Sequence, residues 1–151
     1  MNYSDKTQRF WKYWNKLNSI YADYAKNEGQ TYMSLLVLNI LNIESEHGCT
    51  QKYLMEQTFF PKQTINHIIT TYYKQGIVEL RENKNNRREK IVCLTAAGKE
   101  YAGTILPPLD HALDIAMQQF SEEEQQLLFS LMERYVDTCL ENVLKRESPG
   151  K

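Results

Sequence analysis

The stretch that decides the fold is PKQTINHIITTYYKQGIVELRENKNNRREKIVCLTAAG, Pro61 to Gly98. Its first part has apolar residues at helical spacing, and Gly76 stands where this pattern stops. Two short apolar runs follow, separated by the turn-rich segment NKNNR, which is typical of a β-hairpin. The hairpin segment Arg81 to Lys90 holds five basic residues, two acidic residues and three asparagines. The pattern predicts a helix followed by a hairpin with a positively charged tip.

The predicted helix behind Pro61 has two different faces. An apolar stripe is formed by Ile65, Ile68, Ile69 and Tyr72, as in a helix that packs on a core. The opposite face presents hydrogen-bonding side chains of medium length, instead of the Glu and Lys mixture of an ordinary solvated helix. These side chains are Lys62, Gln63, Asn66, His67, Thr70 and Lys74. A helix that enters the major groove of DNA needs such groups to reach base edges and phosphates.

The charge of the chain is unevenly distributed. The formal net charge is −1, but residues 50–95 carry eight Lys or Arg and four Asp or Glu, a net charge of +4. The remaining residues carry ten basic and fifteen acidic side chains, a net charge of −5. A basic segment between acidic flanks is typical of a module that binds a polyanion.

Length and composition bound the class of protein. The 151 residues are 42% hydrophobic and 25% charged, as in a globular domain. No apolar run approaches the ~20 residues that a membrane span needs, and the N-terminus lacks the apolar core of a signal peptide. We therefore expect a cytoplasmic protein without a membrane partner.

Neither a catalytic nor a metal-binding motif is present in the sequence. We find no phosphate-binding loop, no Gly-x-Ser-x-Gly, no HExxH and no paired histidine and carboxylate motif. His47 and His111 lack a second ligand at metal spacing. Cys93 and Cys139 are predicted to be buried apolar residues, whereas Cys49 lies in a turn-like context and is the best candidate for redox sensitivity. We expect no enzymatic activity, no cofactor and no metal.

The rest of the chain reads as further helices. Aromatic residues at spacings of three and four predict a helix from Asp5 to Lys26, which Gly29 terminates. An almost wholly apolar helix runs from Tyr32 to about Glu46, and Thr50 caps a short helix QKYLMEQT. Thr95 caps the next helix, which Pro107-Pro108 interrupts or restarts. Ser121 and Glu124 form a capping box before a long last helix.

A short helix, a turn, a second helix and a hairpin make a winged helix-turn-helix, and here the chain resembles the MarR family of transcriptional regulators. The resemblance is carried by TQKYL, PKQTINHII and KQGIVELRENKNNRREKIVCLTAAG. Leu94-Thr95-Ala-Ala-Gly98 matches the family's Leu-Thr-x-x-Gly element. Arg88 falls at the position of the family's wing arginine, and Asn86 stands where the family commonly has aspartate.

This resemblance implies the architecture. We expect a mainly α fold with a small two- or three-stranded β wing, in a single domain, 1–151. The winged helix-turn-helix lobe would span residues 32–98. Residues 1–28 and 104–147 would form dimerisation helices, in agreement with their aromatic and aliphatic surface, which one small lobe cannot cover.

The function implied is that of a homodimeric, ligand-responsive repressor that binds a pseudo-palindromic operator in double-stranded DNA. The expected DNA-binding residues are Lys62, Gln63, Thr64, Asn66, His67, Thr70, Lys84, Arg87 and Arg88. By resemblance, a small aromatic ligand could bind in a cleft lined by Trp11, Trp14, Tyr21 and Tyr32. Aromatic residues at helical spacing also suit core and dimer packing, and this interpretation stays open for all four.

Other functions stay open for the same segments. The basic hairpin tip could be merely solvated, and the winged helix could bind a protein instead of DNA. A regulator that responds to oxidants through Cys49 is a further alternative.

Overall fold

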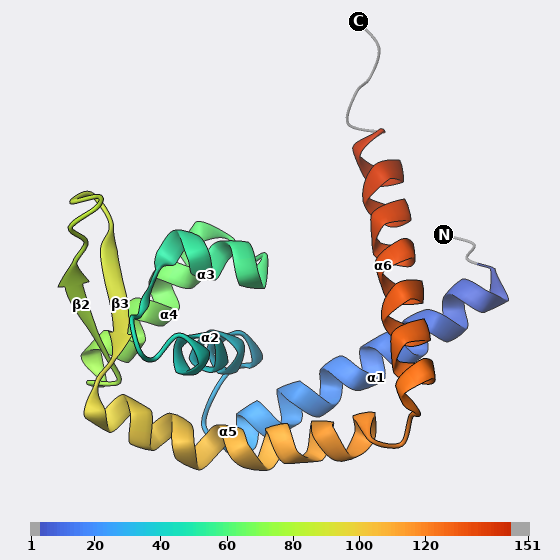
Figure 1. The fold of residues 1–151 in the computed structure, drawn as a ribbon, viewed down its shortest axis with the longest axis horizontal. Helices are drawn as coiled ribbons and strands as arrows, with labels where there is room; N and C mark the ends of the chain where they lie inside the picture. Colours follow the sequence, from blue (N-terminus) through green and yellow to red (C-terminus); the bar gives the residue numbers. More distant parts are fainter. Residues whose placement is uncertain (1–3, 146–151) are drawn as a thin grey trace, which may run out of the picture. The chain divides into compact units, whose positions relative to one another are not determined.

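The computed structural model describes residues 4–145, which fold into six helices and three short strands (Figure 1). The chain divides into two compact units, Met1–Leu109 and Asp110–Lys151. The helices are α1 (Asp5–Asn27), α2 (Tyr32–Ile43), α3 (Gln51–Thr58), α4 (Lys62–Lys74), α5 (Ala96–Met117) and α6 (Glu122–Leu144). The strands are β1 (Cys49–Thr50), β2 (Val78–Glu82) and β3 (Lys90–Leu94).

Helices α1 and α2 begin and end at capping residues. The Ser4 hydroxyl accepts a hydrogen bond from the Thr7 backbone N–H at the start of α1. Gly29, with φ +70°, follows the end of this helix, as the sequence predicts. Helix α2 ends at Ile43, three residues before the predicted end. It buries Leu35, Val37, Leu38 and Leu41, so it forms the centre of the first unit.

Helices α3 and α4 form the predicted helix-turn-helix. The Thr50 hydroxyl accepts a hydrogen bond from the Tyr53 backbone N–H over 3.1 Å and so caps α3, as predicted. Pro61 is the residue immediately before α4. The buried residues of α4 are Ile65, Ile68, Ile69 and Tyr72, the stripe that the sequence predicts.

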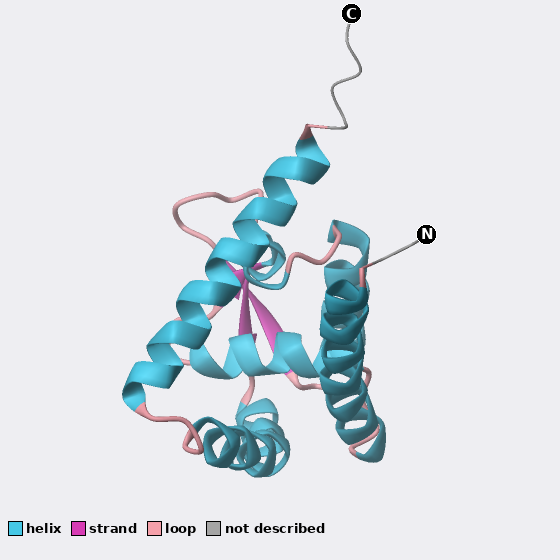
Figure 2. Cartoon of the chain, turned by 90° about the vertical axis from the view of Figure 1, so that its right-hand side faces the viewer, coloured by secondary structure: helices cyan, strands magenta, loops and turns pink. Residues whose placement is uncertain are grey.

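The three strands form one antiparallel sheet in the order β1-β3-β2, the predicted wing with its third strand. Figure 2 shows strands in magenta among the helices. Val78 pairs with Leu94 at the base of the β2–β3 hairpin, and Glu82 pairs with Lys90 near its tip. The two residues of β1 pair with Val92 and Ile91 on the other edge of β3. The central strand β3 is therefore hydrogen-bonded on both edges near the base of the hairpin, from which the tip projects.

Helix α5 corrects one expectation from the sequence. Pro107 and Pro108 lie inside the helix, where they neither end nor restart it. Proline removes the backbone hydrogen bond to the residue four positions earlier, but the residues around the pair, Ile105, Leu106 and Leu109, are buried. Burial of this face keeps the helix continuous in spite of the missing bonds.

The second unit contains the end of α5 and the whole of α6. The capping box is present at the start of α6, with the Ser121 hydroxyl accepting from the Glu124 backbone N–H and the Glu124 carboxylate accepting from the Ser121 backbone N–H. Leu127, Phe129 and Leu140 are each half exposed or more on this helix. Neither α6 nor any other helix within residues 4–145 is long and apolar enough to cross a membrane.

The first turn of α5 passes so close to the start of the hairpin that only glycine fits. A Cβ atom on Gly98 would lie 2.0 Å from the Ile77 carbonyl oxygen, whereas a Cβ atom on Gly103 of the same helix would meet nothing within 4 Å. We predict that Gly98→Ala lowers the free energy of unfolding by about 2–4 kcal/mol, because backbone must move. Gly103→Ala should raise it by up to about 1 kcal/mol through helix propensity. Urea unfolding of both variants measures this, and equal effects would contradict the close approach.

Candidate nucleic-acid interface

Helix α4 presents a polar ridge because its other face is packed on the core. Its buried stripe fixes the rotation of the helix about its axis. Lys62, Gln63, Asn66, His67 and Thr70 are consequently all exposed, and the structure brings them together on the free side of the helix.

A hydrogen-bond network holds the C-terminal half of α4 in place. The Tyr72 hydroxyl is buried and lies 2.9 Å from Gln30 Oε1 and 2.7 Å from the Ser34 carbonyl oxygen, so it shares its proton between these acceptors. The Gln30 side-chain amide in turn donates to the Tyr101 hydroxyl. Burial raises the pKa of Tyr72, which keeps this hydroxyl protonated as a donor. The network connects α4 with α2 and α5.

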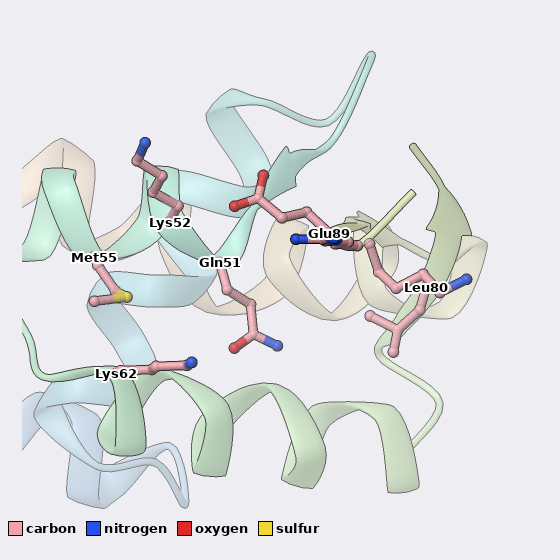
Figure 3. A pocket seen from close by; sticks show the side chains of 8 residues that line it. Gln51, Lys52, Met55, Lys62, Leu80 and Glu89 are labelled. Carbon is pink, nitrogen blue, oxygen red and sulfur yellow. The ribbon is translucent and has the colours of Figure 1, made fainter. Parts of the chain in front are cut away.

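One side of the ridge borders a hollow of about 410 Å³ with a positive lining, which we call the basic hollow (Figure 3). Its walls come from α3, the start of α4 and the hairpin. The lining residues are Gln51, Lys52, Met55, Lys62, Leu80, Arg88, Glu89 and Lys90. Four cations face one carboxylate here, so the hollow suits an anion.

The other side of the ridge borders a hollow of about 640 Å³, which we call the neutral hollow. It lies between α4 and the segment from Gly29 to Ser34 that starts α2. The lining also contains six residues of α4 and the residue that follows the helix: Gln63, Thr64, His67, Ile68, Thr71, Tyr72 and Gln75. No Lys, Arg, Asp or Glu belongs to this lining, so hydroxyl and amide groups supply most of its polar atoms.

The hairpin tip is ordered by its asparagines. Asn83 Oδ1 accepts a hydrogen bond from the Asn85 backbone N–H over 3.0 Å, and Asn86 Oδ1 accepts from the Arg88 backbone N–H over 3.1 Å. Side chains of Asn that cap nearby backbone groups in this way stabilise tight turns. Asn86 therefore holds the backbone of Arg88 with its side-chain amide oxygen.

The cations of the wing differ in how they are paired. Arg81 donates from Nε to Glu79 Oε1 over 2.8 Å, and Arg87 Nε lies 3.8 Å from Glu82 Oε1. Within residues 4–145, Arg88 forms no ion pair and faces the basic hollow, while Lys84 is exposed at the tip. Arg88 is thus the wing arginine with most charge free for a partner.

The structure distributes the predicted DNA-binding residues over four places. Lys62 and Arg88 meet in the basic hollow, whereas Gln63, Thr64 and His67 line the neutral hollow. Asn66 and Thr70 are exposed on the ridge, and the Thr70 hydroxyl donates to the Asn66 carbonyl oxygen over 2.8 Å. Lys84 and Arg87 are exposed on the wing tip.

Sequence reasoning missed two cations of the basic hollow, Lys52 and Lys90. Lys52 is the second residue of α3, two positions after the predicted cap Thr50, and Lys90 is the first residue of β3. Both belong to the basic segment 50–95, so the sequence showed them as part of a positively charged region. Their convergence on one hollow depends on how α3 packs beside the hairpin, which the pattern does not encode.

The four predicted ligand-binding aromatics do not form one group. The rings of Tyr21 and Tyr32 lie 6.0 Å apart, and Tyr32 also lines the neutral hollow. Trp11 and Trp14 lie farther toward the start of α1 and remain 48% and 45% exposed. Trp14 stacks on Phe10 with 6.5 Å between ring centroids.

Two cysteine expectations are corrected by the structure. Cys49 is buried in β1, not in an open turn, and burial raises the pKa of its thiol to about 12. A protonated, buried thiol is a poor nucleophile, which argues against redox sensing at this residue. Cys93 is buried as predicted, but Cys139 on α6 is exposed in the single chain.

Comparison with known proteins identifies the same fold. No protein-family model matches the chain. The chain is 21% identical over 117 residues to the HTH-type transcriptional repressor YetL of Bacillus subtilis. This alignment covers 78% of this chain and 70% of YetL.

Solved structures give the closer likeness. A MarR family regulator from Neisseria meningitidis matches with a TM-score of 0.81 at 22% identity, over 95% of this chain and 99% of that one. A putative MarR family regulator from Listeria monocytogenes, solved in complex with 26mer DNA, matches with a TM-score of 0.71 at 19% identity, over 99% and 98% of the two chains. At these identities the likeness establishes a shared fold.

We predict that Cys49 resists alkylation in the folded chain. With a pKa of about 12, its thiol is protonated at neutral pH, and alkylating reagents need the thiolate. Peptide mapping by mass spectrometry after native treatment with iodoacetamide should show Cys49 unmodified, and the same treatment in denaturant should modify it. Rapid modification of Cys49 in the folded chain would restore the oxidant-responsive alternative.

Proposed function

We propose that this chain, whose fold is that of the MarR family regulators, is a transcriptional regulator that binds double-stranded DNA with sequence specificity. The observation that carries the proposal is the ridge of α4 between its two hollows, with a basic wing beside it. A helix that reads DNA from the major groove lies between two phosphate backbones, and a polar ridge between two hollows suits that position.

The dimensions of DNA suit this surface. The major groove is about 12 Å wide and admits one α-helix. When α4 lies in the groove, the sugar-phosphate backbones on either side pass over the two hollows. The basic hollow then neutralises phosphates with Lys52, Lys62, Arg88 and Lys90, while the neutral hollow offers hydroxyl and amide groups to the other strand.

The ridge supplies the groups for base reading. Asn and Gln can each pair with both major-groove groups of adenine, and Gln63 and Asn66 are exposed near the start of α4. The Thr70 hydroxyl donates its proton to the Asn66 carbonyl oxygen. Toward DNA, the Thr70 hydroxyl oxygen can therefore only accept a hydrogen bond. Lys62 at the helix start meets phosphate, which fixes position without reading sequence.

The wing reaches the neighbouring minor groove. Its tip is ordered by Asn83 and Asn86 and carries Lys84 and Arg87. Arginine in a minor groove senses the negative potential of a narrow groove. Together, the ridge and the wing would read sequence directly and through DNA shape.

We further propose a homodimer that acts as a ligand-responsive repressor. Trp11, Trp14 and Leu17 on α1 are 44–48% exposed, and α6 exposes Leu127, Leu140 and Val143 by 57–59%. Apolar surface of this extent is typical of an interface. A dimer would present two α4 ridges to half-sites of a pseudo-palindrome, and a small aromatic ligand near Tyr21 and Tyr32 would alter their spacing.

A winged helix that binds protein is the competing function. In that case the cations of the basic hollow would have no role in binding, and removal of one of them would not change the affinity for the protein partner. The effect of single wing charges on duplex binding therefore separates the two functions.

We predict that Arg88→Ala weakens duplex binding and lowers the slope of log affinity against log salt by about one, because one phosphate or minor-groove contact is lost. Arg81→Ala is the matched control, since Arg81 is already paired with Glu79 in the same hairpin, and it should change the slope little. Fluorescence anisotropy across a salt series, with the best duplex from a random pool, measures both.

Two results would contradict the proposal. If the Arg88 variant binds the duplex as the parent does at every salt concentration, the wing does not contact DNA. If the parent chain has no higher affinity for any duplex than a neutral protein has, DNA is not its partner.

A further inference from the structure

Phe59, in the turn between α3 and α4, combines a strained backbone with an exposed aromatic side chain. Its φ and ψ are 59° and 20°, in the left-handed region, and its side chain is 91% exposed. Within residues 4–145 the other positions with positive φ are Gly29, Gly48 and Gly76. Among the residues that the structure describes, Phe59 is thus the one non-glycine residue in a conformation that favours glycine.

The conformation is imposed by the turn. The Phe59 backbone N–H donates to the Met55 carbonyl oxygen over 2.8 Å, and the next backbone N–H, of Phe60, donates to the Thr58 hydroxyl over 3.2 Å. These bonds close the end of α3 whatever side chain stands at position 59. Glycine is the residue that folding alone would favour there, so the stability of the chain does not account for phenylalanine.

The position of Phe59 points to the partner. It lies four residues after Met55 and three before Lys62, and both of these line the basic hollow, where Figure 3 labels them. At most about 11 Å of chain separates the Cα atoms of Phe59 and Lys62. Position 59 therefore lies close along the chain to the surface that faces DNA in the proposed function.

We infer that Phe59 is a DNA-contacting residue, whose ring packs against the apolar C–H surface of the bound duplex beside the basic hollow. This inference rests on the proposed function and adds a residue to it. Two groups of DNA offer such a surface, the deoxyribose and the C5-methyl group of thymine, which phenylalanine contacts in major grooves. The strain at Phe59 is then the consequence of placing an aromatic ring on a turn that reaches the duplex.

The test compares stability and binding in the same variants. Phe59→Gly should leave the urea midpoint unchanged or higher, since the strain is relieved, and should weaken binding to the selected duplex about tenfold, as expected when one partly buried aromatic contact is lost. Phe59→Trp keeps a ring and should bind within about twofold of the parent. Ile43→Ala is the control, because it removes an apolar side chain that is 69% exposed at the far end of α2, and it should bind as the parent does.

A duplex with uracil in place of thymine identifies the DNA group. If the Gly variant and the parent bind this duplex equally, the thymine methyl is the contact, and if the difference persists, the deoxyribose is.

The inference is overturned if Phe59→Gly binds as tightly as the parent, if it loses stability together with binding, or if sedimentation shows that its loss of binding follows a change of oligomeric state. A parent chain that binds no duplex overturns the proposed function itself, whereas these other results leave that function standing.

Discussion

The burial of one face of α4 decides what the rest of the lobe can do. Ile65 and Ile69 are fully enclosed, and the Tyr72 hydroxyl is fixed by Gln30 and Ser34. Successive residues of an α-helix are rotated by about 100° about its axis. If the apolar stripe were shifted by one position in the sequence, Gln63 and Asn66 would no longer point to the free side. The apolar stripe thus controls which polar groups form the ridge.

A second constraint places the wing beside that ridge. The Thr95 hydroxyl donates to the Gly76 carbonyl oxygen over 2.6 Å and accepts from the Gly98 backbone N–H over 3.0 Å. The end of α4, the base of the hairpin and the start of α5 therefore meet at one point. Only glycine at position 98 permits this approach to Ile77. Arg88 and Lys90 of the wing line the basic hollow together with Lys62 of α4.

Periodicity and capping patterns predicted much of this arrangement, because they are local. The α4 stripe, the caps at Thr50 and Ser121 and the charged hairpin could all be read from neighbouring residues. Features that depend on distant pairing could not. The two residues of β1 are a strand only because they pair with β3, burial overrides the prolines inside α5, and Lys52 reaches the hollow only through the packing of α3. The exposure of Cys139 was missed because the prediction followed the general tendency of free cysteines to be buried.

If α4 lies in a major groove and reads bases there, selection of duplexes from a random pool should reveal a preferred sequence. We expect enrichment of one motif with two inverted half-sites, one helical turn or roughly 34–36 Å apart, because a dimer presents two α4 helices. Substituting Gln63 or Asn66 should then relax preference within each half-site. A pool that stays random after repeated selection, with duplex binding that depends on salt alone, would contradict base reading by α4.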